Sequence, residues 1–249
     1  MSRRKRNSYF QCRQFRIEQG DCAMKVTTDA SLLGAWVPVE QSHRILDIGS
    51  GTGLLALFAA QRSKAQIDAV EIDPQAAEQA RVNFANSPWP ERLRLIEQDI
   101  RLWARECENG YDCILCNPPF FSDSTKSSCE RTAAARHNDA LPLDELAEAI
   151  ERLLSDDGSA WLLLPLPETE QLIQLAAPLG LHARYRLQVR TSGQHPPHRE
   201  ILQLNRQPGP CQRSEFILYS EHPYHSREAA ALFAPYYTKL RVADEQATG

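Results

Sequence analysis

A strand-like run, a glycine-rich turn and a helix-like run follow one another near the start of this 249-residue chain and restrict its fold more than any other feature. Residues 44–48 form the short apolar run typical of a buried parallel strand, and residues 54–61 are helix-like. Between them, Gly49, Gly51 and Gly53 are spaced G-x-G-x-G. Glycines permit positive φ and close approach to the backbone near a helix N-terminus. The pattern therefore predicts an α/β fold with a nucleotide-cofactor site at this turn.

The spacing of the turn differs from the dinucleotide fingerprint. Leu54 stands where G-x-G-x-x-G requires its last glycine, and Asp47 lies two residues before the first glycine. A cofactor that lacks a pyrophosphate but has a positively charged amino-acid end fits this arrangement better than NAD does. A glycine-rich turn without any ligand is the alternative.

Acidic residues end the second and third strand-like runs. Glu71 lies 18 residues after Gly53, where a carboxylate can accept hydrogen bonds from both hydroxyls of a ribose. Asp99 is either an acceptor for an adenine amino group or a turn-forming residue. Asp73, followed by Pro74, predicts a helix N-cap in preference to a ligand contact.

The tetrapeptide Asn-Pro-Pro-Phe at residues 117–120 follows a fourth strand-like run, residues 111–116. Proline lacks an N–H and has a fixed φ, so the segment leaves the sheet and turns its carbonyls outward. The side-chain oxygen of Asn117 and the carbonyl of Pro118 then offer two acceptors to a planar amino group, with the Phe120 ring available for stacking. A proline-terminated strand with an incidental aromatic residue is the alternative.

In chain order, the four strand ends carry D-I-G-S-G-T-G, E-I-D, Q-D and N-P-P-F. This set resembles the class I S-adenosylmethionine-dependent methyltransferases that act on exocyclic or amide nitrogens. Residues 10–17, 24–36, 216–219 and 233–240 narrow the resemblance to the bacterial tRNA adenine-N6 methyltransferases, which modify the adenosine 3′ of the anticodon in a valine tRNA. The resemblance implies an α/β, doubly wound, mostly parallel seven-stranded Rossmann-like sheet.

The resemblance also implies that the cofactor is S-adenosyl-L-methionine, that no metal or obligate protein partner takes part, and that the partner is tRNA, bound through its anticodon loop. The catalytic residues it implies are Asn117, Pro118 and Phe120. The residues expected to contact the cofactor are Lys25, Asp47, Gly49, Gly51, Gly53, Glu71 and Asp99, and those expected to contact the substrate are Pro119, Arg13, Arg16, Arg131, Arg136 and His137. Guanine-N2 methyltransferases of ribosomal RNA and glutamine-amide methyltransferases acting on release factors share the N-P-P motif and stay open as alternatives. A non-catalytic binding module is the weakest alternative.

Charge is distributed unevenly along the chain. The net charge of −4 does not by itself indicate a nucleic-acid binder, but residues 1–17 contain six Arg or Lys and no acid. Tyr9, Phe10 and Phe15 lie among them, a combination that suits phosphates and unpaired bases. We therefore expect residues 1–20 to form a basic and aromatic arm, of which residues 2–6 could equally be a solubilising tail.

The rest of the chain predicts one methyltransferase domain over residues 21–242 and a disordered tail over residues 243–249. Within it, a helical face beginning at Leu143 is expected to stop at Gly158, followed by a strand over residues 159–164. The Ser/Thr-rich loop at residues 122–128 is placed to close over a substrate.

No run of eighteen apolar residues and no apolar segment after the basic N-terminus are present, so the expected location is cytoplasmic. Seven cysteines, an odd number, favour reduced thiols over a disulfide framework. Cys113 and Cys116 are expected to be core residues on opposite faces of a strand. His195 and His198, separated by two prolines, predict a loop turn in preference to a metal site.

Overall fold

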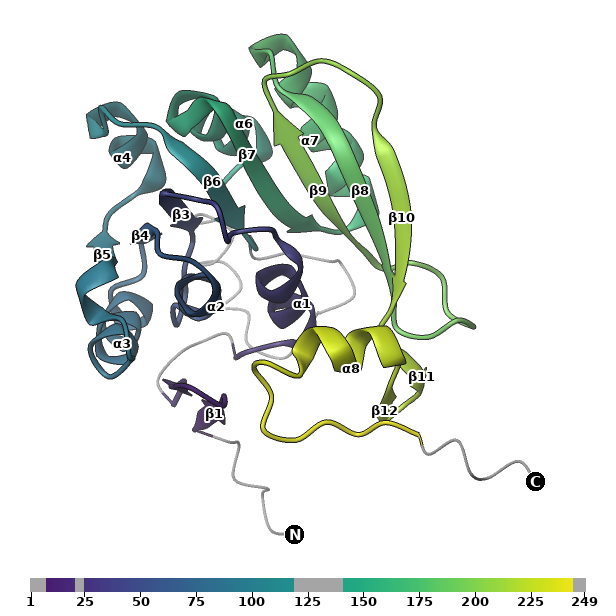
Figure 1. Cartoon of the computed structure of the whole chain (residues 1–249). Coiled ribbons are helices and arrows are strands. Elements are labelled where there is room, and N and C mark those ends of the chain that lie inside the picture. The colour runs from purple at the N-terminus through teal and green to yellow at the C-terminus, as the bar shows by residue number, and fades with distance from the viewer. Residues whose placement is uncertain (1–7, 21–24, 119–140, 244–249) are drawn as a thin grey trace, which may run out of the picture.

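An eight-stranded, mostly parallel sheet forms the centre of the computed structural model, which describes residues 8–20, 25–118 and 141–243 (Figure 1). Its strands are β3 (Arg44–Ile48), β4 (Gln66–Glu71), β5 (Leu93–Glu97), β6 (Tyr111–Cys116), β7 (Leu154–Leu164), β8 (His182–Arg190), β9 (Arg199–Asn205) and β10 (Gln212–Ile217). They lie in the order β10-β8-β9-β7-β6-β3-β4-β5. Within this sheet only β9 runs antiparallel to its neighbours.

Helices cover both faces of the sheet and enclose two hydrophobic cores. One core contains residues of α1 (Thr28–Trp36), α2 (Leu54–Arg62), α3 (Pro74–Ala85) and α8 (Arg227–Phe233). The other contains residues of α4 (Ile100–Glu106), α6 (Leu143–Leu153) and α7 (Leu166–Ala176). Cys113 belongs to the first core and Cys116 to the second, so the prediction that they lie on opposite faces of one strand is confirmed.

Short polar residues fix where the helices begin. The side chain of Thr27 accepts a hydrogen bond from the Ala30 N–H at 3.1 Å and caps α1. At α3, Asp73 Oδ1 accepts from the Ala76 N–H at 2.8 Å, and Pro74 occupies the first helical turn. Caps of this kind satisfy N–H groups that have no partner within the helix. The prediction that Asp73 is an N-cap is confirmed.

The predicted fold class is confirmed, and the sheet has one strand more than the seven expected. The additional strand, β10, pairs in parallel with β8 from Gln212 beside Tyr185 to Ile217 beside Arg190. Only Phe216 of β10 is fully buried. An edge strand with one buried side chain lacks the apolar alternation that identifies an inner strand.

The strand after α6 was expected to begin at residue 159, and this boundary is wrong. The helix ends at Leu153 and β7 begins at Leu154, so Gly158 lies inside the strand and does not end the helix. Its role is steric, because a Cβ at this position would lie 2.8 Å from the carbonyl oxygen of Tyr111. The pairing of β6 with β7 is irregular between Tyr111 and Cys113, which is typical of a β-bulge.

Two small antiparallel hairpins and two 3₁₀ turns complete the described elements. The N-terminal hairpin consists of β1 (Tyr9–Gln11) and β2 (Arg16–Glu18), and the second of β11 (Tyr219–Glu221) and β12 (Tyr224–His225). The 3₁₀ turns are η1 (Pro90–Arg92) and η2 (Ala177–Leu179). Among the described residues, no helix is both long enough and apolar enough to cross a membrane.

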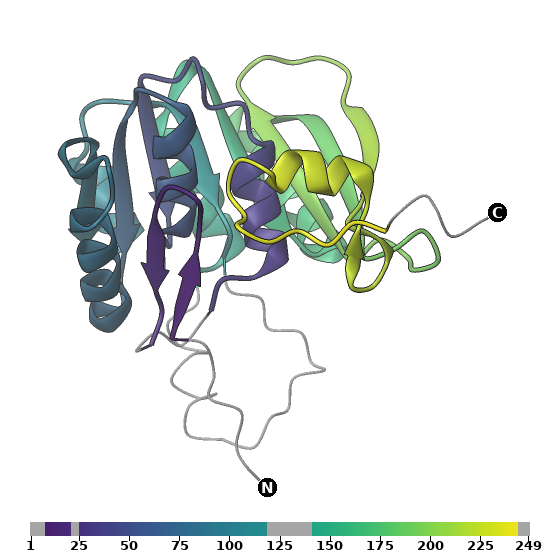
Figure 2. The same cartoon turned by 60° about the horizontal axis from the view of Figure 1, so that its bottom comes forward.

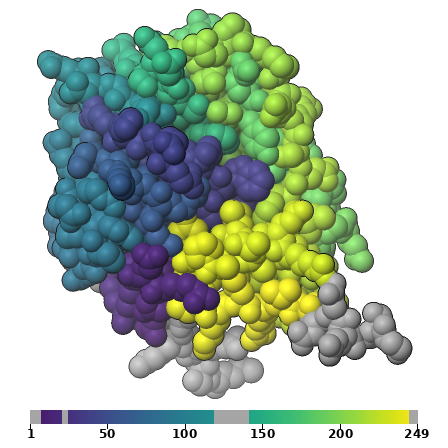
Figure 3. Space-filling view, viewed as in Figure 1, coloured from purple at the N-terminus to yellow at the C-terminus, as the bar shows by residue number. Residues whose placement is uncertain are grey.

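The N-terminal hairpin packs against the body of the protein and does not extend from it. Phe15 is 4% exposed and meets Phe58 and Trp89 edge to face, with ring centroids 6.0 and 5.8 Å away. The Arg13 N–H donates to the Tyr236 carbonyl at 2.8 Å, so residues near both ends of the chain are in contact (Figure 3). The expectation that Phe15 stacks on unpaired bases is wrong, because its ring is inside the protein.

Candidate functional site

The carboxyl ends of β3, β4, β5 and β6 meet at one edge of the sheet, because these strands are parallel and in register. Ile48 lies beside Val70 on β4 and beside Cys116 on β6, and Glu71 lies beside Glu97 on β5. The residues that follow these strand ends are the glycine-rich turn, Ile72-Asp73, Gln98-Asp99 and Asn117-Pro118. In parallel sheets, ligands bind outside this edge. The four motifs are therefore assembled in one place.

The glycine-rich turn leaves open space beside its backbone. Gly49, Gly51 and Gly53 have φ values of 67°, 55° and 83°, in the left-handed region. A Cβ added at Gly49 or Gly51 would meet no atom within 4 Å, whereas one at Gly53 would lie 2.3 Å from the Phe84 ring. Gly49 and Gly51 thus allow a ligand to approach the backbone. Gly53 allows α3 to pack against the turn.

Asp47 lies beneath the turn and is completely buried. Its Oδ2 atom accepts from the Ala56 N–H at 3.1 Å, while Oδ1 has no hydrogen-bond partner among the described residues. Burial raises the pKa of Asp47 to about 7; the Ala56 hydrogen bond opposes this shift, and the charge of Glu71 adds to it. The buried hydroxyl of Ser50 also lacks a partner among these residues. Buried polar atoms are normally hydrogen-bonded, so two unpartnered atoms beside an open turn indicate a place for a polar ligand.

Glu71 shapes the turn and retains the capacity to bind a ligand. Its Oε2 atom accepts from the Gly51 N–H at 2.7 Å, and its Oε1 atom accepts from the Asp73 N–H at 2.9 Å. An ionised carboxylate has about four acceptor positions, so two backbone donors leave room for two hydroxyl donors. The side chain is 8% exposed, at the edge where a ribose would lie. This geometry fits the predicted ribose contact.

Asp99 is bound by both the backbone and the side chain of Arg101. Its Oδ1 atom accepts from the Arg101 N–H at 2.8 Å, so it caps α4 as a turn-forming Asp would. The Arg101 guanidinium lies 2.8 Å from Oδ2 and also binds Glu145 at 2.9 Å. The side-chain hydrogen bond from Arg101 is the main cause of the lowered pKa of Asp99. Contact between Asp99 and an adenine stays a prediction, and it requires Asp99 to share its oxygens with Arg101.

Ile72 is a candidate site residue that the sequence did not single out. It lies between Glu71 and Asp73 at the carboxyl end of β4, and it is 51% exposed. Leu102, in the first turn of α4, is 47% exposed. Apolar side chains at the rim of a polar site offer a surface to a flat ring. One feature of the sequence could have identified Ile72. It is an apolar residue between two acids, at a turn position where a polar, solvated residue is expected.

Comparisons with known proteins identify the family to which the chain belongs. The family model described as "Methyltransferase small domain" matches residues 22–138. The chain is 39% identical over 242 residues to the tRNA1(Val) (adenine(37)-N6)-methyltransferase of Shewanella loihica, covering 93% of this chain and 99% of the relative. It is 42% identical over 216 residues to the protein of the same name from Aliivibrio fischeri, covering 86% and 92%. The chain belongs to this methyltransferase family.

Solved structures show the same fold at low sequence identity. A predicted O-methyltransferase from Agrobacterium tumefaciens superposes with a TM-score of 0.65 at 16% identity, covering 87% of this chain and 99% of that one. The ribosomal protein L11 methylase of Lactobacillus delbrueckii superposes with a TM-score of 0.55 at 15% identity, covering 77% and 84%. At such identities the likeness concerns the fold alone.

The methyltransferase motif is described only at its first two residues. Asn117 and Pro118 follow β6 directly at the carboxyl edge and are half-buried. No hydrogen bond joins the Asn117 side chain to another residue that the structure describes. The other expected residues around the motif lie outside the described ranges: Pro119, Phe120, Arg131, Arg136 and His137.

The basic residues of the N-terminal hairpin have partners within the protein. Arg13 Nε donates to the Ala234 carbonyl at 2.8 Å. The Arg16 guanidinium lies 2.6 Å from Glu18 Oε1 and 3.8 Å from the centre of the Tyr9 ring. Contact between these two arginines and the substrate stays a prediction. A substrate phosphate would have to compete with the protein groups that the arginines already bind. Lys25, also a predicted cofactor contact, lies between the hairpin and α1 and is half-buried.

The two histidines for which a metal site was considered lie in a loop, and the two cysteines of β6 lie in the core. The hydroxyl of Ser192 and Nδ1 of His195 are 2.7 Å apart within the β8–β9 loop, and His198 Nε2 lies 3.4 Å from Asp29 Oδ2. Cys113 and Cys116 are buried with free thiols. Over residues 8–20, 25–118 and 141–243, no three His, Cys, Asp or Glu side chains gather as a metal site requires.

Proposed function

We propose that this protein transfers a methyl group from S-adenosylmethionine to N6 of adenosine 37 in tRNA1(Val), the nucleotide 3′ of the anticodon. The observation that carries the proposal is the 39% identity to the Shewanella methyltransferase of that name over 93% of this chain. The alignment includes segments outside the common cofactor-binding core. A tRNA substrate also agrees with the cytoplasmic location expected from the sequence.

The turn at residues 49–53 suits this cofactor. The space beside Gly49 and Gly51, the unpartnered Oδ1 of Asp47 and the remaining acceptor capacity of Glu71 fit a nucleoside with a polar amino-acid end and no pyrophosphate. Bound there, S-adenosylmethionine supplies a methyl group already activated by its sulfonium. Glu71 would hold the ribose hydroxyls, and Ile72 would lie against the adenine ring of the cofactor.

Asn117 and Pro118 supply what the acceptor nitrogen needs. Adenine N6 is a poor nucleophile because its lone pair is delocalised into the ring. The side-chain oxygen of Asn117 and the carbonyl of Pro118 accept hydrogen bonds from its two N–H groups, direct the amino group toward the methyl, and stabilise positive charge as it develops. Alkylation makes the nitrogen acidic, so no strong general base is required. Stacking on Phe120 would hold the base in place.

The position of the target base keeps the cost of reaching it low. Adenosine 37 is unpaired in the anticodon loop, so it need not be extruded from a duplex before it enters the site. Single-stranded loops are also the places where proteins bind RNA bases by stacking and by hydrogen bonds to base edges.

Nucleoside analysis of tRNA from a strain lacking the gene tests the proposal. We expect N6-methyladenosine to disappear at position 37 of tRNA1(Val) and to return when the purified protein and S-adenosylmethionine are added. Parallel reactions with ribosomal RNA and release factor, using labelled cofactor, test the other two N-P-P activities. Persistence of the modified adenosine, or loss of N2-methylguanosine from ribosomal RNA, would refute the tRNA assignment.

A further inference from the structure

Asn83 of α3 is a buried polar residue that joins two separate parts of the protein. Its side chain is 1% exposed. Its Oδ1 atom accepts from the Glu18 N–H at 2.8 Å, and its Nδ2 atom donates to the Glu18 carbonyl at 3.0 Å and to the Thr52 carbonyl at 2.9 Å. Every one of these partners is a backbone group, and both amide hydrogens are used.

One end of this connection is the cofactor turn. Thr52 lies between Gly51 and Gly53, and because glycine lacks a Cβ, this stretch of backbone is easy to deform. The Gly51 N–H is held by Glu71, and the Gly53 N–H donates to the Ser50 carbonyl at 2.8 Å. These two contacts come from the turn itself and from the adjacent strand end. The Asn83 contact comes from outside the site.

The other end is the N-terminal hairpin. Asn83 pairs with both the N–H and the carbonyl of Glu18, as a residue of a neighbouring strand would. It therefore extends the hydrogen bonding of β2 onto α3, and Figure 2 shows the hairpin beside α3 and α2. The next residue, Phe84, occupies the space beside Gly53. Two consecutive residues of α3 thus contact two consecutive residues of the turn.

We propose that Asn83 is a positioning residue that couples the cofactor turn to the N-terminal hairpin. A bound cofactor restrains the Thr52 carbonyl, the restrained Asn83 amide holds Glu18, and the hairpin becomes more rigid. The significance for RNA rests on the proposed function and on the expectation from the sequence that Arg13 and Arg16 of this hairpin contact tRNA. Linkage then requires that cofactor and tRNA strengthen each other's binding by the same factor.

Hydrogen–deuterium exchange with S-adenosylhomocysteine as the probe tests the coupling without RNA. In the native protein we expect the probe to slow exchange of amides in residues 9–18. Asn83→Ala removes all three bonds and should abolish this protection, and it should weaken the probe's affinity by roughly three- to tenfold. Asn86→Ala, at the exposed C-cap of the same helix, should behave as the native protein does. Protection of residues 9–18 that is equal in the native protein and Asn83→Ala would overturn the proposal.

Asn83→Asp separates the two ends of the connection. The carboxylate can still accept from the Glu18 N–H but can donate to neither the Glu18 nor the Thr52 carbonyl. We therefore expect a hairpin that keeps one of its two bonds to residue 83 and no longer responds to the probe. Should the buried charge prevent folding, Asn83→Ala decides the question alone.

Affinity for the probe measured with and without tRNA1(Val) gives a second readout. We expect tRNA to tighten probe binding in the native protein and in Asn86→Ala, with that factor falling toward one in Asn83→Ala. An equal loss of probe affinity with and without tRNA would mean that Asn83 only stabilises the turn. If exchange is coupled through Asn83 but tRNA is neither bound nor methylated, the coupling stands and the proposed substrate is wrong.

Discussion

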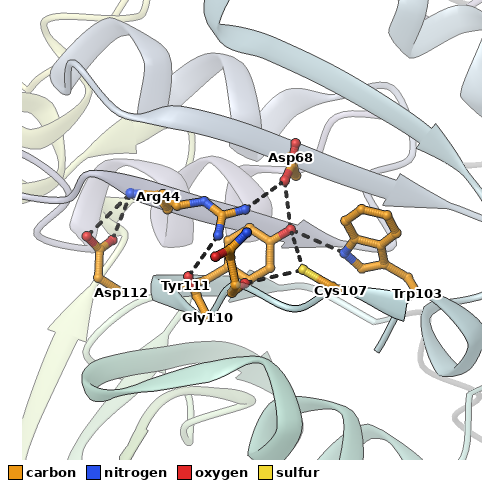
Figure 4. Close-up of polar contacts among 8 residues, drawn as sticks. Arg44, Asp68, Trp103, Cys107, Gly110, Tyr111 and Asp112 are labelled. Atoms are coloured by element: carbon orange, nitrogen blue, oxygen red, sulfur yellow. Dashed lines mark hydrogen bonds and ion pairs between the residues drawn. The ribbon is translucent and has the colours of Figure 1, made fainter. Parts of the chain in front are cut away.

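Polar residues lie at both ends of strands β3, β4 and β6, but only those at the amino end have their hydrogen bonds completed by other protein groups. At the amino end, the Tyr111 hydroxyl donates to Asp68 Oδ2 at 2.7 Å and accepts from Trp103 Nε1 at 3.2 Å (Figure 4). Arg44 lies 3.5 Å from Asp68 Oδ2, and its guanidinium is 4.7 Å from the centre of the Tyr111 ring. The carboxylate of Asp112 accepts from the Arg44 N–H. This end is a network of groups that satisfy one another.

At the carboxyl end, Asp47 and Ser50 each keep a buried polar atom without a partner among the described residues, and Glu71 keeps free acceptor positions. The amino end and the carboxyl end belong to the same strands, and both contain polar residues. What differs is whether protein groups complete the hydrogen bonding. A completed network stabilises the fold, whereas an incomplete one costs stability that a ligand can restore on binding.

The largest effect at the carboxyl end is expected from Asn117→Ala. Its hydrogen bond should strengthen as charge develops on N6, so turnover should fall at least ~10²-fold with little change in cofactor affinity. Single-turnover methylation of tRNA1(Val) measures the effect, and thermal unfolding checks the fold. Phe120→Tyr, which keeps the ring, should retain turnover. A large loss of unfolding free energy in Asn117→Ala would place this residue with the structural network instead.

Glu71→Ala should weaken cofactor binding by about 2–4 kcal/mol, because it removes a charged acceptor for two hydroxyls and releases the Gly51 N–H. Calorimetric titration with S-adenosylhomocysteine measures this. Glu97→Ala is the matched control, since Glu97 lies beside Glu71 in the sheet register but faces Arg81. Similar losses in both variants would indicate a general effect of charge and no ribose contact.

Tyr111→Phe tests the amino end and should show the reverse behaviour. Removing the hydroxyl leaves Asp68 and Trp103 without a shared partner, so the free energy of unfolding should fall by about 1–3 kcal/mol. Cofactor affinity and turnover at a permissive temperature should stay unchanged. Chemical denaturation and the same calorimetric titration measure the two quantities. A specific loss of cofactor affinity in Tyr111→Phe would contradict the assignment of the amino end to stability and of the carboxyl end to cofactor binding.

Asp47, at the carboxyl end, should make the free energy of unfolding depend on pH. Its pKa is raised to about 7 in the folded protein, so the folded state retains a proton that the unfolded state releases near pH 4. The unfolding free energy should therefore fall as pH rises toward 7, by on the order of 1–2 kcal/mol between pH 5 and 7. Asp47→Asn should lack this decline. Denaturation curves of both proteins across this range measure the difference, and parallel pH profiles would contradict the buried, unpartnered carboxyl.

The smallest effect is expected from Arg16→Ala in the hairpin. The ion pair between Arg16 and Glu18 is exposed, so unfolding free energy should change by less than about 0.5 kcal/mol. If Arg16 contacts a phosphate, tRNA affinity should fall a few-fold and the salt slope by about one. Arg94→Ala, the same charge loss on β5, is the control. Equal tRNA affinities in the two variants would remove Arg16 from the RNA surface.

The sequence was sufficient to predict which residues gather at the candidate site, because each motif follows its strand directly. Parallel strands in register bring such motifs to one edge, so the grouping of the residues that follow Ile48, Glu71 and Cys116 needed only short-range patterns and one topological rule. The same reasoning predicted the N-cap at Asp73 and the two core cysteines.

The contacts that the sequence did not predict join residues far apart in the chain. Asn83 is a single asparagine in a helix and gives no local sign that it binds Glu18, 65 residues earlier. Phe15 is an aromatic residue in a basic segment, and its burial depends on Phe58 and Trp89. Local composition describes what a segment can bind, while tertiary packing decides what it does bind.

The contact between the N-terminal hairpin and the segment after α8 has a consequence for biosynthesis. Arg13 donates to the carbonyl of Ala234, 221 residues further along. At about 5–20 residues per second, the ribosome makes the second partner roughly ten to forty-five seconds after the first. The central sheet and the contacts of the hairpin with Phe58, Asn83 and Trp89 can form during that interval, whereas the contacts of Arg13 with Ala234 and Tyr236 form only when translation is nearly complete. A chain interrupted before Ala234 would therefore contain all four strand-end motifs while Arg13 of its hairpin still lacked its partners.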